Sequence, residues 1–191
     1  RDVKLAGAIH SKGMMILKAY LSTLFAQDGP IPLSTSLTLE QSYHEVDGDS
    51  ASMAEFCALI SAMSGMPVRQ DLAITGSMNQ FGDAQPIGGV NEKIEGFFDT
   101  CRLQGLTGTQ GVIIPRQNAR NLMLADEVLA ACRAGKFHIY AVDRVEHVLE
   151  LLLSDTSVPG YEEVYERVRN RIARMREIEK AHSEPASASP I

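Results

Sequence analysis

The sequence has no hydrophobic run that would cross a membrane, because no stretch approaches the roughly 20 apolar residues that a bilayer requires. It has no secretory signal pattern at its start. It also has no excess of positive charge. The formal net charge is -6, which argues against nucleic acid as the main partner. These absences exclude a membrane-spanning chain and favour a globular domain with other partners.

Cysteine is scarce. The three cysteines, Cys57, Cys101 and Cys132, are far apart, odd in number and set in mainly apolar, helix-like sequence. This pattern favours reduced, buried thiols in a cytoplasmic protein over a disulfide framework. No pair of cysteines or histidines stands at the short spacing of a zinc site, so the sequence predicts no metal centre.

Histidine is present but belongs to no nucleophile or metal motif. The five histidines are His10, His44, His138, His147 and His182. We interpret each of them as an ordinary surface or packed residue. A serine enzyme built from this sequence would therefore need a base other than histidine.

The 191 residues, about 45% of them hydrophobic, are enough for one domain with a substantial core. The composition changes after Ser154, where Pro159-Gly160 interrupts the chain and apolar residues then recur at helical spacing. The sequence therefore predicts a domain over residues 1–154, an appended amphipathic helix over 155–182 and a disordered tail over 183–191. Because the first residue is Arg1 instead of Met, we expect a piece of a longer protein.

Hydrophobic periodicity predicts a mixture of helices and strands. The expected helices cover residues 11–27, 51–63, 90–104, 118–124, 126–134 and 145–153. The expected strands cover residues 33–46, 72–76, 80–87, 112–114 and 137–142. Because these elements mingle without regular βαβ spacing, we expect an α/β or α+β domain with a mixed sheet and flanking helices.

Ser50 lies where the strand-like run ends and the apolar segment 51–63 begins. A serine there can sit at the N-terminal end of a helix, facing unpaired N–H groups and the positive end of the helix dipole. That position suits an oxygen nucleophile and the oxyanion that it creates. Asp and Ser before an apolar run are also ordinary helix caps, so both interpretations stay open at this point. Ser52 is a rival nucleophile by proximity.

Lys93 follows the glycine turn Gly88-Gly89 in helix-like sequence. A serine hydroxyl is a poor nucleophile until a base removes its proton. A lysine can be that base when burial lowers its pKa from roughly 10.4, and a helix N-terminus acts in the same direction. The neighbours of Lys93 are apolar and can exclude water: Pro86, Ile87, Val90 and Ile94. A solvated helix lysine is the alternative.

Several blocks of this sequence, taken in order, resemble the proteolytic domain of Lon proteases. The main ones are Gly48-Asp49-Ser50 and residues 86–94, supported by residues 67–76 and 111–115. The resemblance covers roughly residues 9–153 and matches the branch whose serine follows Gly-Asp instead of Gly-Pro. It implies the Lon fold and a serine-type endopeptidase in which Ser50 and Lys93 form the catalytic dyad.

The resemblance also implies supporting residues. Thr75 matches a threonine that accepts the lysine's hydrogen bond and aims its amine. Asp47 matches an aspartate that pairs with the lysine in a resting state. The backbone N–H groups of Ser50 and Ala51 are the expected oxyanion donors. The alternative is that Thr75 and Asp47 are only turn residues, without a role in the site.

Lon proteases join this domain to an AAA+ ATPase, and they work as hexameric rings on unfolded or regulatory proteins. The sequence contains no G-x-x-x-x-G-K-[ST] loop, so we expect no cofactor in this chain, with ATP and Mg bound by an ATPase segment before Arg1. A non-proteolytic Lon-like assembly module is the alternative function. A serine–lysine amidase that acts on small molecules is a third.

Overall fold

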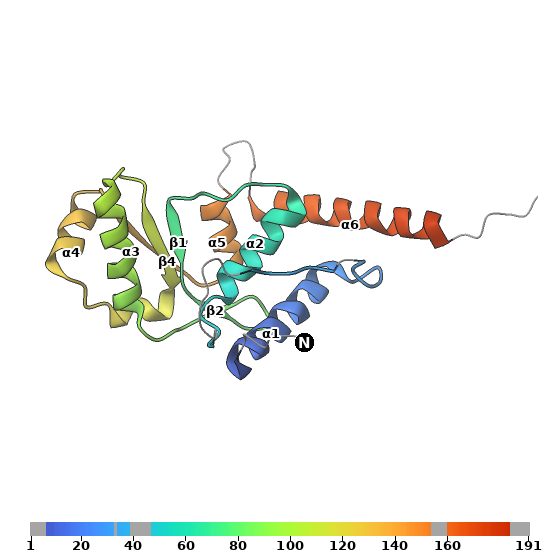
Figure 1. The fold of residues 1–191 in the computed structure, drawn as a ribbon, viewed down its shortest axis with the longest axis horizontal. Helices are drawn as coiled ribbons and strands as arrows, with labels where there is room; N and C mark the ends of the chain where they lie inside the picture. Colours follow the sequence, from blue (N-terminus) through green and yellow to red (C-terminus); the bar gives the residue numbers. More distant parts are fainter. Residues whose placement is uncertain (1–6, 33, 39–46, 154–159, 184–191) are drawn as a thin grey trace, which may run out of the picture.

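The computed structural model describes residues 7–32, 34–38, 47–153 and 160–183 and is organised around a parallel sheet (Figure 1). The strands are β1 (Leu72–Ile74), β4 (Gly111–Pro115) and β5 (His138–Val142), in the order β1-β4-β5. Ala73 pairs with Val112, and Val112 in turn pairs with Ile139. All five residues of β4 are buried, as expected for the central strand of a covered parallel sheet.

Helices cover both faces of this sheet because alternate residues of β4 point to opposite sides. Val112 and Ile114 pack with α3 (Val90–Gln104) and α4 (Asp126–Arg133). Ile113 packs in the other core with α2 (Ser52–Ser64) and α5 (Val145–Leu152), which α1 (Ala8–Phe25) and α6 (Tyr161–Ser183) flank. The result is the predicted α/β architecture, with the helices close to their expected bounds. Residues 116–121 form a 3-10 helix, η1 (Arg116–Asn121), in place of the helix expected over 118–124.

The sheet differs from the predicted mixed sheet. The three-stranded sheet is entirely parallel, and the antiparallel pairing lies in a separate ribbon of β2 (Ser77–Met78) and β3 (Ala84–Gln85). The strands expected over 72–76 and 80–87 leave residues 77–79 as their connection, but residues 77–78 form β2 and the turn falls later. Asn79 Oδ1 accepts hydrogen bonds from the backbone N–H groups of Phe81 and Asp83, and Gly82 adopts a positive φ. Of the strand expected over 33–46, residues 33 and 39–46 lie outside the described part, and residues 34–38 form no regular element.

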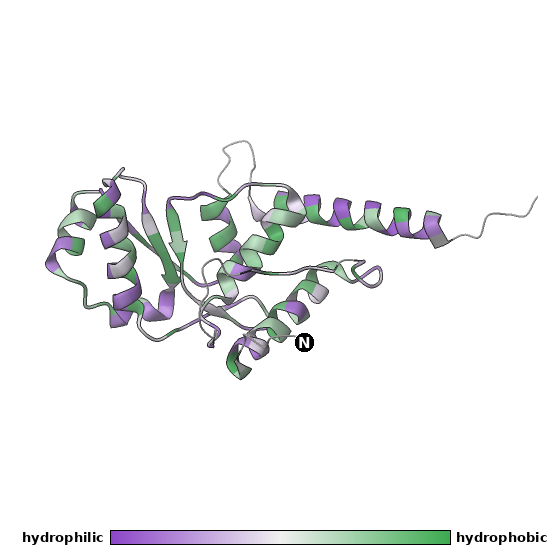
Figure 2. Cartoon of the chain, in the orientation of Figure 1, coloured by the Kyte–Doolittle hydropathy of each residue, from purple (hydrophilic) through white to green (hydrophobic). Residues whose placement is uncertain are grey.

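Helix α2 is the centre of the larger core. Met53, Phe56 and Ile60 are fully buried, which agrees with the prediction of a central helix that is covered on most sides. Gly65 ends the helix in the left-handed conformation that favours glycine. In Figure 2 the hydrophobic colour is concentrated on α2 and β4, whereas α6 carries alternating polar and apolar bands.

Helix α6 shares its core with α2, which explains its amphipathic pattern. Val164, Tyr165, Val168 and Ile172 are buried there. Polar contacts support the packing, since Arg171 donates a hydrogen bond to the carbonyl oxygen of Ala62 near the end of α2. The C-terminal part of α6 projects beyond the domain (Figure 1).

A buried polar cluster joins α1, α5 and α6. The Glu146 carboxylate accepts hydrogen bonds from the hydroxyls of Tyr20 and Tyr165 and from the Arg144 guanidinium. Burial, together with this carboxylate, raises the pKa of both tyrosines. The cluster holds α1 against the α5–α6 side of the domain.

Replacing Ile172 by alanine is expected to lower the free energy of unfolding by about 2–5 kcal/mol, because a buried side chain is lost from the core that α6 shares with α2. Ile178 lies on the same helix and is the matched control, since 59% of it is exposed against 2% of Ile172. Ile178→Ala should change the free energy by less than about 0.5 kcal/mol. Urea unfolding followed by circular dichroism measures both. Equally small effects would show that α6 does not belong to the core.

Candidate active site

The serine predicted as the nucleophile lies in a loop directly before α2. We call residues 47–51 the serine loop. Its backbone is tied to the exit of β1, because Gly76 N–H donates to the carbonyl oxygen of Ser50 at 2.8 Å and Met53 N–H donates to the carbonyl oxygen of Gly76 at 3.2 Å. A Cβ atom at Gly76 would overlap Met53 Cε and would lie 3.1 Å from Pro115 Cγ. A larger residue at this position would therefore displace the Met53 side chain, which packs beneath the loop.

Lys93 lies in the first turn of α3, and its side chain reaches the serine. Gly89 begins this helix in the left-handed conformation, and Lys93 N–H donates to the Gly89 carbonyl oxygen. Lys93 Nζ lies 3.0 Å from Ser50 Oγ, within hydrogen-bonding distance. The fold thus brings together two residues that stand 43 positions apart in the sequence.

The turn that presents α3 is held by two asparagines that the sequence analysis did not single out. Buried Asn118 accepts from Ile87 N–H through Oδ1 and donates to the Ile87 carbonyl oxygen through Nδ2. Asn91 donates to the carbonyl oxygen of Asn121 and accepts from Met123 N–H. These bonds lock the start of α3 against η1, so Lys93 projects from a rigid support.

The apolar shelter predicted around Lys93 is not formed by the described residues. Lys93 is exposed and Ser50 is half-buried. Val90 and Ile94 are buried, but they pack against the sheet and not around the amine. The reason is helical periodicity, because residues 90, 94, 98 and 101 form the inner face of α3 and Lys93 lies on another face.

Thr75 lies beside the serine loop and Asp47 lies within it, but among the described residues neither is hydrogen-bonded or ion-paired with the lysine. Thr75 is buried directly after β1, and its N–H donates to the carbonyl oxygen of Ile113. Asp47 Oδ1 accepts from the backbone N–H of Ile9 at 3.2 Å and so caps α1. Within the described ranges, no hydrogen bond joins the Thr75 hydroxyl to Lys93 and no ion pair joins Asp47 to it.

The rival serine is occupied elsewhere. Ser52 is only 1% exposed, and its Oγ donates to the carbonyl oxygen of Asp49 at 2.6 Å. A buried hydroxyl held in this way cannot meet a substrate. Of the two serines, only Ser50 offers its side chain to Lys93.

The start of α2 is suited to an anion. Ala51 is the N-cap of this helix, and the helix dipole places partial positive charge beside Ser50. Among the described residues, the N–H groups of Ser50 and Ala51 donate to no backbone acceptor, whereas those of Ser52 and Met53 do. The two groups predicted as oxyanion donors are thus not engaged with the described backbone.

Glu55 is a buried carboxylate in the first turn of α2 that the sequence analysis passed over. Burial raises the pKa of this carboxyl, and the nearby His10 lowers it. His10 Nε2 lies 3.7 Å from Glu55 Oε1, and both side chains are mostly buried. Glu55 is the single charged residue in the mainly apolar segment 51–63, and that was the signal that could have revealed it.

Two further observations limit the chemistry. Among the described residues, no group of three or more His, Cys, Asp and Glu side chains is arranged to hold a metal ion. No helix in the described part of the chain is both long and apolar enough to span a bilayer.

Comparison with known proteins agrees with this arrangement. Residues 43–155 match the family described as the Lon protease (S16) C-terminal proteolytic domain. A Lon protease homolog of Escherichia coli (strain K12) is 53% identical over 186 residues, which are 97% of this chain and 32% of that protein. An archaeal Lon protease of Thermococcus kodakarensis is 37% identical over 132 residues, 69% of this chain and 19% of that protein.

The chain therefore spans about a third or less of the length of these relatives. The matched region contains Ser50, Lys93, the parallel sheet and the helices α2 to α5. With the family match covering more than half of the residues, this chain belongs to the Lon protease family as a C-terminal proteolytic domain.

Proposed function

We propose that this chain is the proteolytic part of an ATP-dependent Lon-type protease, and that it is a serine endopeptidase with Ser50 as nucleophile and Lys93 as base. The observation that carries the proposal is the 3.0 Å separation of Lys93 Nζ and Ser50 Oγ. The proteolytic domain family of the chain supports the reaction class.

The reaction is an acyl transfer. Neutral Lys93 takes the proton of the Ser50 hydroxyl as the oxygen attacks the peptide carbonyl. The oxyanion is stabilised at the start of α2, by the dipole and by the N–H groups of Ser50 and Ala51. Lys93 then gives its proton to the leaving amine. Water, deprotonated by Lys93, hydrolyses the acyl-enzyme and releases the carboxylic acid product.

Because Lys93 is exposed in this chain, the proposed reaction needs another part of the complex to exclude water from its amine. A lysine amine in contact with water favours its charged form, and removing the water favours the neutral form that the reaction needs. In this chain Val90 and Ile94 face the sheet and leave the amine open. We propose that bound polypeptide, or neighbouring subunits of a homo-oligomeric ring, complete the enclosure.

The family resemblance supports the wider proposals. They are a hexameric ring, an AAA+ segment that binds ATP and Mg, unfolded or regulatory proteins as substrates, and a cytoplasmic location. Free thiols at Cys57, Cys101 and Cys132 support the last of these. The alternative, a non-proteolytic assembly module, has no use for a serine and a lysine in contact, and this favours the enzyme. Cleavage of an unfolded protein but not of small amides would separate the peptidase from an amidase.

Ser50→Ala should abolish labelling by a serine-reactive acylating inhibitor and reduce cleavage of an unfolded protein by on the order of a thousandfold or more, because the attacking oxygen is lost. Ser52→Ala is the matched control, since its hydroxyl is buried and bonded to Asp49. Mass spectrometry of the labelled peptide identifies the modified residue. Labelling of the Ser50→Ala variant at Ser52 would exchange the roles of the two serines.

Lys93→Met should reduce both labelling and cleavage to a similar extent, because the variant keeps much of the side-chain length but has no amine to accept the proton. Lys136→Met, at another exposed lysine, is the control for loss of one positive charge. Progress curves with a fluorogenic peptide give kcat and KM for both variants. A normal kcat in Lys93→Met would remove the lysine from the reaction.

A further inference from the structure

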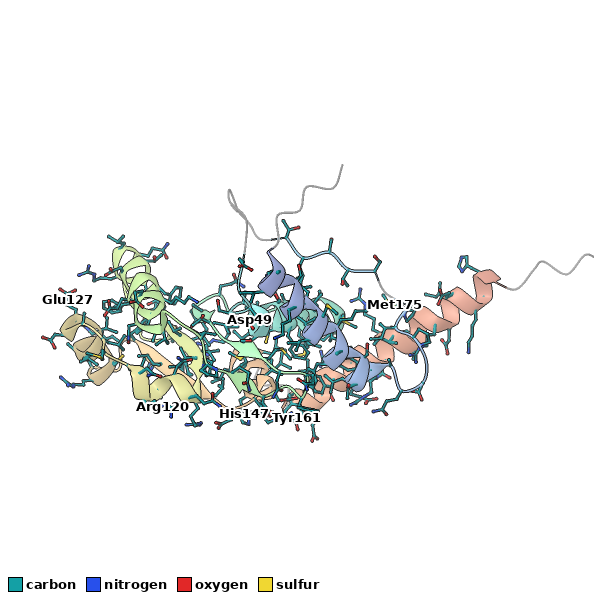
Figure 3. The ribbon with its side chains drawn as sticks, turned by 90° about the horizontal axis from the view of Figure 1, so that it is seen from below. Asp49, Arg120, Glu127, His147, Tyr161 and Met175 are labelled. Atoms are coloured by element: carbon teal, nitrogen blue, oxygen red, sulfur yellow. The ribbon has the colours of Figure 1, made fainter. Side chains whose placement is uncertain are left out.

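We propose that the first two turns of α1 act as a positioning element that holds the serine loop against Lys93. The inference rests on the proposed Ser50–Lys93 chemistry, but it concerns residues that do not touch the reacting atoms. The N-cap residue Gly7 and two residues in the first two turns of α1, His10 and Gly13, approach the loop or the first turn of α2. In Figure 3 Asp49 lies beside the N-terminal helix α1.

The first contact is a cap that comes from the loop itself. Asp47 Oδ1 accepts from Ile9 N–H, one of the donors at the start of α1 that have no partner within the helix. A Cβ atom at Gly7 would overlap the Asp47 carboxylate, so the absence of a side chain lets the carboxylate reach the helix. The negative charge also suits the positive end of the helix dipole. The N-terminus of α1 thus holds one end of the serine loop.

The second contact is the approach of His10 to Glu55, where the Nε2 and Oε1 atoms lie 3.7 Å apart and form an ion pair when the imidazole is protonated. It joins the first turn of α1 to the first turn of α2, five residues after Ser50. Both side chains are mostly buried, so this contact helps to keep the starts of the two helices close together.

The third contact is the close approach of Gly13. A Cβ atom at this position would lie 3.1 Å from Ser52 Oγ and 3.2 Å from Asp49 Cβ. Glycine inside a helix lowers its stability relative to alanine, so its presence there calls for a packing reason. The reason here is space, since the α1 backbone lies directly against the residues on both sides of Ser50 and Ala51.

These contacts matter because the Ser50–Lys93 geometry has little tolerance. Their atoms stand 3.0 Å apart, and proton transfer needs the two groups to stay within hydrogen-bonding distance. Asn91 and Asn118 hold the start of α3, which carries Lys93, so the loop is the part whose position remains to be set. The backbone of Gly76 is hydrogen-bonded to the loop at Ser50, and α1 contacts the same loop at Asp47 and Asp49.

The role of Asp47 is tested by comparing Asp47→Asn with Asp47→Ala. Asparagine also caps helices, whereas alanine does not. Hydrogen exchange of peptides that cover residues 47–53 should therefore be several-fold faster in Asp47→Ala than in Asp47→Asn. If Asp47 acts as a counter-ion of Lys93 instead, both variants lose the charge, and their loop exchange will be equal.

Gly13→Ala against Gly96→Ala is the main experiment. Both glycines lie within helices, but a Cβ atom at Gly96 has nothing within 4 Å, so its alanine variant gains helix propensity without crowding. Gly13→Ala should push Asp49 and Ser52 away by a few tenths of an ångström. We expect faster exchange in the loop, and acylation of Ser50 and kcat lower by roughly tenfold with KM within about twofold. Gly96→Ala should match the parent chain.

The two readouts separate this inference from the proposed function. Normal loop exchange in Gly13→Ala, or loop exchange equal in Gly13→Ala and Gly96→Ala, overturns the positioning role whatever the catalytic result. If Ser50→Ala alone abolishes acylation and Gly13→Ala keeps full activity, the peptidase proposal stands and the positioning role of α1 is overturned. If loop exchange is altered in Gly13→Ala but the parent chain shows no acylation, the positioning role stands and the peptidase proposal is overturned.

Discussion

The backbone bridge between Gly76 and the serine loop is the contact on which the site depends. Gly76 follows β1, and its N–H and C=O bond to Ser50 and Met53, so the end of a strand directly holds the start of α2. The pairing of β1 with β4 sets where that strand ends. Because parallel strands share one carboxyl edge, the residues that follow β1 and β4 meet there, and ligands of open α/β sheets bind at such edges. Asn118, after β4, holds the turn that precedes α3 at this same edge.

Two helix starts are brought together in this way for different purposes. The start of α2 offers positive potential beside Ser50, and the N–H groups of Ser50 and Ala51 have no backbone acceptor among the described residues. The start of α3 carries the lysine, on a helix whose inner face is anchored in the sheet through Val90 and Ile94. Lys93 thus comes from an anchored helix, and Ser50 comes from the short serine loop that directly precedes α2. The same anchoring leaves the lysine exposed, so the domain presents a site that is assembled but open.

The protein core explains why α6 accompanies this domain. Val168 and Ile172 cover α2 on the side away from the sheet, and Tyr165 reaches the buried Glu146. Helix α2, which directly follows the serine loop, is thereby enclosed by α1, α5 and α6. An element outside the matched family region therefore contributes to the packing around the candidate site.

The local sequence was enough to predict most of the helices and to identify Ser50 and Lys93 as the candidate nucleophile and base. The spacing of Val90, Ile94 and Phe98 specifies an amphipathic helix, and Gly88-Gly89 specifies the turn before it, because periodicity and backbone freedom are properties of a few neighbouring residues. Only the tertiary structure decided which partners these residues meet. Asp47 bonds Ile9, 38 positions away, and caps α1 in place of pairing with the lysine. Lys93 meets Ser50, 43 positions away, and Gly76 bonds the serine loop, because these contacts form only when segments that the sequence keeps far apart are folded together.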